Sequence, residues 1–128
     1  FPGYFMELNT EHVMLGMGLF APKRKVMDVF REKIEGEPDT FRELVQKDVF
    51  GRGFSVEGES YKKPVHNTLS DFFQPWMNRK AVYVMKTLPV SDERIYSDAL
   101  ALLLADDFTH LAGLYRLMVE AREEVAPL

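Results

Sequence analysis

The segment NRKAVYVMKTL, residues 78–88, predicts the central strand of the fold. Val82 and Val84 lie on one face of an extended chain, and the other face carries Ala81, Tyr83 and Met85. Because apolar side chains occupy both faces, both need cover, which is typical of an inner strand. Lys86 is the exception on the Val82 face, and the strand should end before Pro89, which cannot donate to a ladder.

Two strands that precede this segment are expected to form a hairpin. Side chains alternate in character over residues 3–8 and 13–20, and residues 9–12 join the two strands. Gly16 and Gly18 share one face of the second strand, where they leave room for a closely packed helix or a ligand. The third glycine and the helix start that a dinucleotide-binding loop requires are missing.

A pair of helices should follow the hairpin. Apolar residues recur at helical spacing over residues 23–35, and Gly36 is placed to end that helix. Residues 40–43 have the form of a capping box and should start the second helix of the pair. The first turn of the first helix, residues 23–25, is Lys-Arg-Lys. These cations oppose the helix dipole, and the arrangement tolerates an anion nearby.

The region between the helical pair and the central strand has a weaker pattern. Residues 54–57 and 61–63 predict two short strands joined by a turn. Residues 67–76 predict a short helix, which Pro75 should shorten or kink. The apolar residues 72–77 are interpreted as core, with an exposed aromatic ledge for stacking as the alternative.

A long C-terminal helix is expected from Ser97 toward Glu124. Its apolar stripe recurs at helical spacing through Leu100, Leu104, Phe108, Leu111, Tyr115 and Met118. The sequence therefore predicts one α+β domain over residues 1–128. It has an antiparallel or mixed sheet with the helical pair on one face and the long C-terminal helix packed across it.

Asp107 is the clearest anomaly in the chain, because it falls near the middle of the apolar stripe of that helix. A carboxylate on a buried face needs a partner, since an unpaired one would cost several kcal/mol or take up a proton. We expect the partner to be Arg79, Lys80 or a backbone amide at the start of the central strand. The favoured interpretation is a structural carboxylate that fixes the helix on the sheet, and the alternative is a catalytic group.

The composition limits the function classes. A chain of 128 residues with 46% hydrophobic residues can form one core. There is no cysteine, so disulfides and thiolate metal sites are excluded and a reducing cytoplasm is the expected location. The longest apolar run is too short to span a bilayer, so no membrane role is expected. A net charge of −4 does not favour nucleic acid as the partner.

Basic residues are nevertheless concentrated in one part of the chain. Residues 61–86 contain five lysines and arginines against one acidic residue, Asp71, which gives this segment a net charge of +4. The leading hypothesis is a non-enzymatic binding or interaction domain for a small anionic ligand or an acidic protein surface. The ligand-binding residues would be Lys62, Lys63, Arg79, Lys80, Trp76 and Asp107. The alternative interpretation of the charges is a solvated edge.

Two other hypotheses remain open. The first is an enzyme in which Asp107 and His110 act with a cationic clamp of Arg79 and Lys80, although the sequence assigns no catalytic residue. The second is that the residue 72–77 segment or the Gly16 face receives a second copy of the chain or a missing N-terminal portion. Asp106 and His110 have a spacing that can chelate a metal, but nothing brings further ligands to them, so no metal and no cofactor is predicted.

Four segments of the chain, taken in order, resemble the C-terminal part of the bacterial domain-of-unknown-function family 2461. The first is GMGLFAP (16–22), which precedes an amphipathic helix, and the second is GESYKKP (58–64). The third is the Arg79-Lys80 pair, which leads into a hydrophobic strand, and the fourth is ADDF (105–108), which is followed by two leucines. Members usually have an additional N-terminal portion, and their loop after the paired lysines is richer in Gly, Tyr and His than PVHNT here. The resemblance implies a fold but no established activity.

Overall fold

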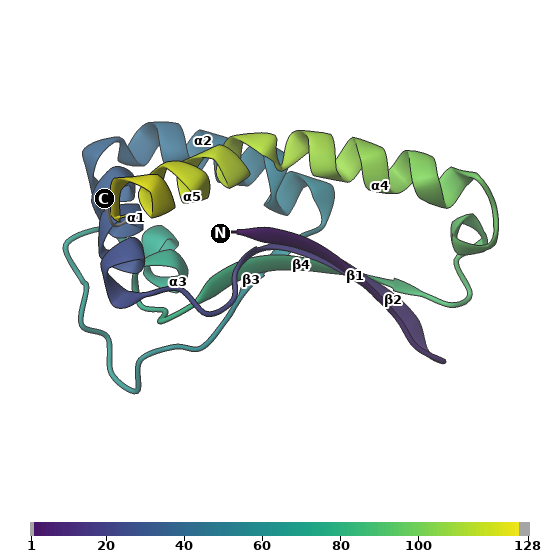
Figure 1. The fold of residues 1–128 in the computed structure, drawn as a ribbon, viewed down its shortest axis with the longest axis horizontal. Coiled ribbons are helices and arrows are strands. Elements are labelled where there is room, and N and C mark those ends of the chain that lie inside the picture. The colour runs from purple at the N-terminus through teal and green to yellow at the C-terminus, as the bar shows by residue number, and fades with distance from the viewer. Residues whose placement is uncertain (1, 126–128) are drawn as a thin grey trace.

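The computed structural model describes residues 2–125 and has an α+β fold. A four-stranded antiparallel sheet has the strand order β1-β2-β4-β3, and helices gather on one side of it (Figure 1). The predicted fold class is therefore confirmed. None of the described helices is long and apolar enough to cross a bilayer.

The predicted hairpin is present as β1 (Gly3–Leu8) and β2 (His12–Leu19). Asn9 organises the turn, because its Oδ1 accepts hydrogen bonds from the backbone N–H groups of Glu11 and His12, both at 2.8 Å. An asparagine side chain that bonds the backbone two and three residues on stabilises a turn without help from the sheet.

The inner position of the central strand is also confirmed. β4 (Val82–Pro89) pairs with β2 on one side and with the short β3 (Ser55–Glu57) on the other. The second short strand predicted over residues 61–63 is wrong, because those residues lie in a loop, which begins just after a bridge between Ser60 and Arg79. The loop follows Gly58, whose φ of 129° favours glycine and whose missing Cβ lets the chain pass close to the Ala81 carbonyl.

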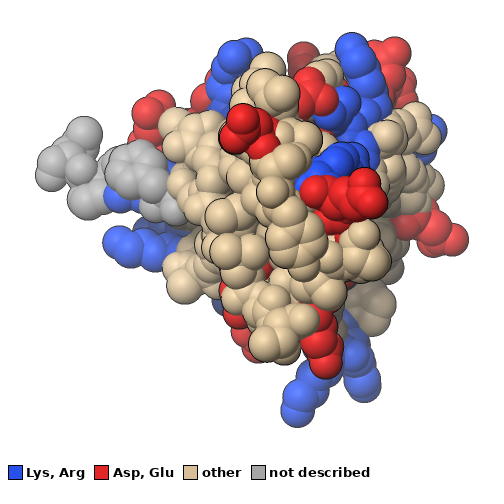
Figure 2. Space-filling view, turned by 90° about the vertical axis from the view of Figure 1, so that its right-hand side faces the viewer, with Lys and Arg blue, Asp and Glu red and all other residues tan. Residues whose placement is uncertain are grey.

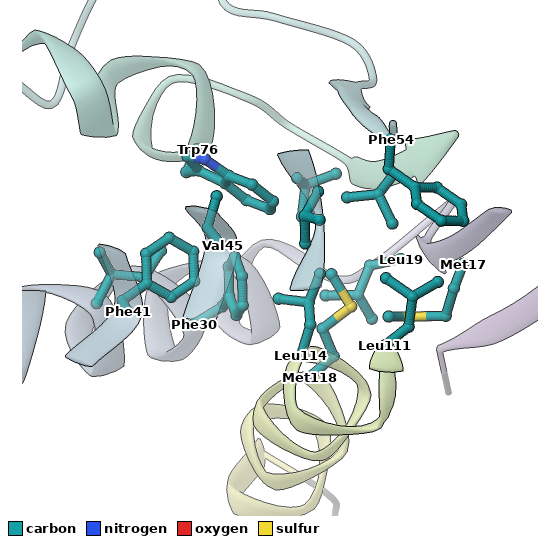
Figure 3. Close-up of a cluster of buried hydrophobic side chains, with 14 of the residues drawn as sticks. Met17, Leu19, Phe30, Phe41, Val45, Phe54, Trp76, Leu111, Leu114 and Met118 are labelled. Atoms are coloured by element: carbon teal, nitrogen blue, oxygen red, sulfur yellow. The ribbon is translucent and has the colours of Figure 1, made fainter. Parts of the chain in front are cut away.

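Three helices cover the sheet and enclose the core: α1 (Arg24–Gly36), α2 (Pro38–Asp48) and α5 (Ala112–Val125). Figure 3 shows the α5 side chains Leu114 and Met118 beside the β2 side chains Met17 and Leu19. These four side chains are at most 3% exposed. The alternation of β2 thus places every second side chain under the helices.

The second helix begins earlier than its sequence suggested. α2 starts at Pro38, so the predicted capping box at residues 40–43 does not form. Proline is favourable in a first helical turn, where its missing N–H would have no partner. The preceding residue, Glu37, also ends α1 by donating its N–H to the carbonyl of Lys33, which leaves little room for another cap.

The aromatic segment before β4 belongs to the core. Residues 71–73 form a 3-10 turn, η2 (Asp71–Phe73), and α3 (Gln74–Met77) follows with Pro75 in its first turn. Trp76 is fully buried and packs edge-on against Phe41, with ring centroids 5.1 Å apart. The core interpretation is correct for this tryptophan, and an exposed ledge there is excluded.

The long C-terminal helix is two helices. After η3 (Glu93–Tyr96), α4 (Ala99–His110) ends at Leu111 and α5 begins at Ala112. Leu111 is fully buried and lies at the junction. Gly113 has a packing role beside it, because a Cβ there would stand 2.7 Å from Leu44 Cδ1. The glycine therefore lets α5 approach α2 closely.

No described helix covers the Gly16 face of the sheet, contrary to the packing expected there (Figure 1). A Cβ at Gly16 would overlap the Val84 carbonyl oxygen and the Phe5 ring, and a Cβ at Gly18 would overlap Tyr83. The rings of Phe5 and Tyr83 therefore occupy the space that the glycines leave. Aromatic side chains that cover glycines on a neighbouring strand are a known stabilising arrangement of sheets.

Candidate anion-binding site

The predicted site residues fall into three separate environments. Arg79 and Lys80 lie at the start of β4, next to the loop that contains Lys62 and Lys63. Trp76 is in the core, and Asp107 is a fully buried residue of α4. An open cavity lies beside the first of these environments.

Arg79 is used to hold the backbone together. Its guanidinium donates to the carbonyl oxygens of Pro75 at 2.7 Å, Gly58 at 2.5 Å and Val56 at 3.5 Å. Its own carbonyl accepts a hydrogen bond from Arg31 Nη1 at 3.1 Å. Arg79 therefore ties α3, β3 and the following loop to the start of β4, and its charge is directed at backbone dipoles.

Asn78 closes the loop of residues 61–66. Its Oδ1 accepts hydrogen bonds from the N–H groups of Val65 and His66, both at 2.8 Å, and its Nδ2 donates to the carbonyl of His66 at 2.9 Å. Its backbone carbonyl accepts from the N–H of Tyr61 at 3.1 Å. One residue thus fixes both ends of the loop, which is a role that its sequence neighbourhood did not indicate.

A cavity of about 440 Å³ lies between this loop, the first turn of α1 and Lys80. We call it the Tyr61 cleft. Its lining residues are Pro22, Arg24, Met27, Tyr61, Val65, His66 and Lys80. Lys80 is 51% exposed, and its Nζ stands 5.7 Å from the centroid of the Tyr61 ring and 3.7 Å from Glu59. Arg24 comes from the basic first turn noted in the sequence.

Arg31 is a buried cation behind the cleft, and it is absent from the predicted site residues. It is 2% exposed, and its Nη2 pairs with Asp28 Oδ1 at 2.7 Å. Its guanidinium carbon stands 6.0 Å from the centroid of the Tyr61 ring. Arg31 is four residues beyond the buried Met27, so it lies on the apolar face of α1. The same periodicity that singled out Asp107 would have found it.

His66 is neutral at pH 7. Burial lowers its pKa below the ordinary value of 6.5, and the nearby positive charge of Arg31 lowers it further. Asp28 and Glu35 oppose this shift, and Arg24 adds to it. The imidazole therefore gives the cleft a hydrogen-bonding group without a charge, which neither attracts nor repels an anion.

Lys62 and Lys63 are exposed on the loop and do not line the Tyr61 cleft. A second hollow, of about 190 Å³, lies between α2 and α5 and is largely apolar. Lys33 on its rim is already paired with Glu124 at 2.7 Å and stands 3.8 Å from Glu120. The charge of Lys33 is therefore already balanced by carboxylates of α5.

Asp107 is fully buried and paired with two cations. Arg52 Nε, in η1 (Phe50–Arg52), stands 3.1 Å from its Oδ1, and Lys86 Nζ stands 2.6 Å from its Oδ2. Lys86 also donates to the carbonyl of Arg52 at 2.9 Å and lies 5.0 Å from the centroid of the Phe54 ring. The carboxylate thus joins α4 to β4 and η1.

The partners expected for Asp107 were wrong. Arg79 and Lys80 precede β4, whereas Lys86 is its fifth residue, roughly 13 Å along the strand from Val82. Asp107 is held at that far half of the strand. The paired, structural interpretation of the carboxylate is consistent with these contacts, and the one charged residue on the Val82 face of the strand is its partner.

The catalytic arrangement suggested by the sequence is not assembled. His110 contacts Asp106, with Nδ1 2.9 Å from its backbone oxygen and 3.6 Å from its Oδ1. Asp106 in turn pairs with Arg52. Within residues 2–125, no group of three or more acidic or histidine side chains is arranged to hold a metal ion.

The comparisons with known proteins give a family and no activity. No curated protein and no solved structure is significantly similar to this chain. The family model described as "Conserved hypothetical protein (DUF2461)" matches residues 1–116. The resemblance noted in the sequence is thus confirmed over most of the chain. This chain belongs to the DUF2461 family of conserved hypothetical proteins.

Proposed function

We propose that this chain is a binding domain that holds a small anionic ligand with an apolar part in the Tyr61 cleft. One observation carries the proposal. Arg24 and Lys80 are far apart in the sequence, yet both line one open cavity together with an aromatic ring. Two cations beside a partly apolar cavity are suited to neutralise a phosphate or carboxylate group.

The other walls of the cleft suggest the rest of the ligand. Pro22, Met27 and Val65 are apolar, and the ring of Tyr61 provides a flat surface. The cavity of about 440 Å³ is within the range of small-molecule sites. An extended nucleic acid does not fit this size, and the net charge of −4 disfavours it further.

The loop that forms one wall is already closed by Asn78, so little ordering is needed on binding. A preorganised site loses less conformational entropy when it binds. Lys62 and Lys63 on the same loop would act only at longer range, by attracting an anion to this side of the molecule.

The test uses phenyl phosphate, inorganic phosphate and phenol as probes, and their binding is measured by thermal shift and calorimetry. Phenyl phosphate should bind best, because it presents a charge to the cations and a ring to the apolar wall. A ligand at a hundred times its Kd adds about 2.7 kcal/mol to stability, which gives a clear rise in Tm. Phenol should give none.

Two matched double variants locate the site. Each lysine or arginine changed to glutamate lowers the charge by two, so R24E/K80E and K62E/K63E both change the net charge from −4 to −8. We expect R24E/K80E to weaken phenyl phosphate binding at least tenfold and K62E/K63E to weaken it less than threefold.

Equal losses in the two variants would mean that binding depends on the general charge of this side of the molecule and not on the cleft. No binding of any anionic probe to the unmodified chain, at millimolar concentration and low salt, would contradict the proposal. Circular dichroism of each variant checks that the exposed substitutions leave the fold intact.

A further inference from the structure

The two edges of the sheet are protected very differently. β1 pairs only with β2, and no described segment pairs with its other side. A strand at an edge presents unpaired N–H and C=O groups, on which another strand can form hydrogen bonds. The structure therefore contains a template for strand addition over Gly3–Leu8.

β3, at the opposite edge, is blocked in several ways. It has only three residues and lies between Gly53 and Gly58, which have φ values of 85° and 129°. The Arg79 side chain donates to the carbonyl oxygens of Val56 and Gly58, so backbone acceptors there are already used. Short edges with covered backbone groups are the usual way in which proteins prevent strand addition.

β1 has none of these protections. Its sequence, GYFMEL, has no proline, no lysine and one charged residue, Glu7. On the helix side of the sheet, Tyr4 is 40% exposed, Met6 45% and Leu8 64%. A six-residue edge strand with a row of exposed apolar side chains is poorly suited to remain alone in water.

Exposed apolar side chains also occur at one end of the molecule. Figure 2 looks at the end of the molecule where η3, the start of α4 and the β1–β2 turn lie, and its centre carries few charged side chains. Tyr96 in η3 is 74% exposed, and Leu102 in α4 is 72% exposed. Tyr96 and Leu102 belong to η3 and α4, so they provide an exposed apolar surface outside the strand with which β1 can be compared.

We propose that the partner of β1 is a second copy of this chain, which pairs with it antiparallel about a two-fold axis. The two four-stranded sheets then form one continuous eight-stranded sheet. A two-fold axis brings the same surface of both copies together, so the strand must be complementary to itself.

The charges and side chains of β1 select the register. In a two-fold antiparallel pair, one residue lies opposite its own copy, and residues that face each other share a face of the sheet. A pair centred on Glu7 would oppose two carboxylates, which is unfavourable. A pair centred on Phe5 leaves Leu8 without a partner within the strand.

A pair centred on Met6 satisfies both conditions. It places Met6 opposite Met6 of the second copy, and Tyr4 opposite Leu8, so the three exposed apolar side chains of each strand are covered. Glu7 then lies opposite Phe5 on the other face, which no described helix covers, and its carboxylate stays in water.

Sedimentation of the full chain over a range of concentrations tests the pairing. We expect a monomer–dimer equilibrium with a Kd in the micromolar range. M6K should weaken dimerisation at least tenfold, because two ammonium groups would then face each other at the axis. Y96K is the matched control, since it adds the same charge to an exposed apolar position outside β1, and it should dimerise as the unmodified chain does.

Engineered cysteines test the register directly, because the chain has no cysteine of its own. Under mild oxidation, M6C should form disulfide-linked dimers much faster than L102C, since facing Cβ atoms of a strand pair are within reach of a disulfide. This measurement remains informative even if M6K folds poorly.

Three results would overturn the proposal. One is a chain that stays monomeric at several hundred micromolar. Another is a dimer that M6K leaves intact and Y96K disrupts, which would assign the interface to the apolar end. The third is crosslinking through L102C in preference to M6C.

Discussion

Asp107, Lys86 and Arg52 show how single charged residues position an entire helix. The carboxylate has no exposed surface, and each of its oxygens is paired with a cation from a different element. Removing one partner of a buried pair costs about 3–5 kcal/mol, because a buried charge is left behind. Replacing both partners by apolar residues costs much less.

We therefore expect K86M to lower the free energy of unfolding by about 3 kcal/mol. The double variant D107L/K86M should recover most of this loss, since it removes the carboxylate together with one of its two cations, while the other, Arg52, keeps its pair with Asp106. Urea unfolding of the two variants and the unmodified chain measures both effects. A neutral K86M, or a double variant less stable than K86M alone, would contradict this account of the ion pair.

Asn78 should be the residue on which the order of the 61–66 loop depends. N78A removes the side-chain bonds to Val65 and His66, and we expect the backbone N–H groups of these two residues to exchange with deuterium at least tenfold faster. The loss in global stability should be about 1–3 kcal/mol. N67A, an exposed change in the adjoining loop, is the control and should leave exchange at both amides unchanged.

His66 should make stability depend on pH in a defined direction. Its pKa is lowered in the folded chain, so the unfolded chain takes up the proton first as the pH falls. The stability that depends on neutral His66 is therefore complete above the unfolded pKa, near 6.5, and is lost below it. Between about pH 7 and pH 5, the Tm of the unmodified chain should fall relative to that of H66Q. A difference that is constant with pH would show that the imidazole titrates normally.

At the scale of elements, the close packing of β2 against β1 and β4 depends on Gly16, which has no side chain. G16A places a methyl group against the Phe5 ring and the Val84 carbonyl, and the carbonyl is part of the sheet backbone and cannot easily move. We expect a loss of roughly 2–3 kcal/mol in chemical denaturation. G36A is the control, because a Cβ there has nothing within 4 Å, and it should change stability by less than about 1 kcal/mol.

The elements could be predicted where local pattern and tertiary packing agree. Alternating side chains identified β1, β2 and β4, and helical spacing identified α1. The division at Leu111 does not follow from the apolar stripe, which continues through it, although Gly113 is a local signal of a kink nearby; the break lies at Leu111, which is buried in the core. The helix propensity of the local sequence does not show where tertiary packing will interrupt a helix.

The candidate site was predicted only in part, because it too depends on contacts between segments that are far apart in the sequence. The basic segment pointed to Lys80, and the basic helix start pointed to Arg24. That these two share a cavity depends on the path of the loop, which Asn78 fixes through hydrogen bonds. Arg79 looked equivalent to Lys80 in the sequence, yet its carbonyl partners give it a structural role.

At the scale of the whole molecule, the two proposed interactions occupy different regions and have different physical character. The Tyr61 cleft adjoins α1 and the start of β4, whereas the exposed row of β1 leads toward the turn of the hairpin (Figure 1). The first uses cations, and the second uses backbone hydrogen bonds and apolar side chains. Ionic strength should therefore separate them.

Raising NaCl from 50 to 500 mM should weaken phenyl phosphate binding several-fold, because salt screens the attraction between exposed charges. The dimer constant should change less than twofold, since Glu7 is the only charged residue of β1. Calorimetry and sedimentation in the same buffers measure the two constants. A dimer that dissociates with salt would mean that charged groups outside β1 hold the two copies together.

The consecutive residues Asn78, Arg79 and Lys80 have a kinetic consequence. The first fastens the loop of the cleft, the second anchors that region to β3 and α3, and the third reaches the cavity. The cleft is thus fastened to the start of the central strand by hydrogen bonds, and we expect it to bind without a closing motion. Association should then occur in a single step, with an observed rate that rises linearly with ligand concentration and shows no plateau.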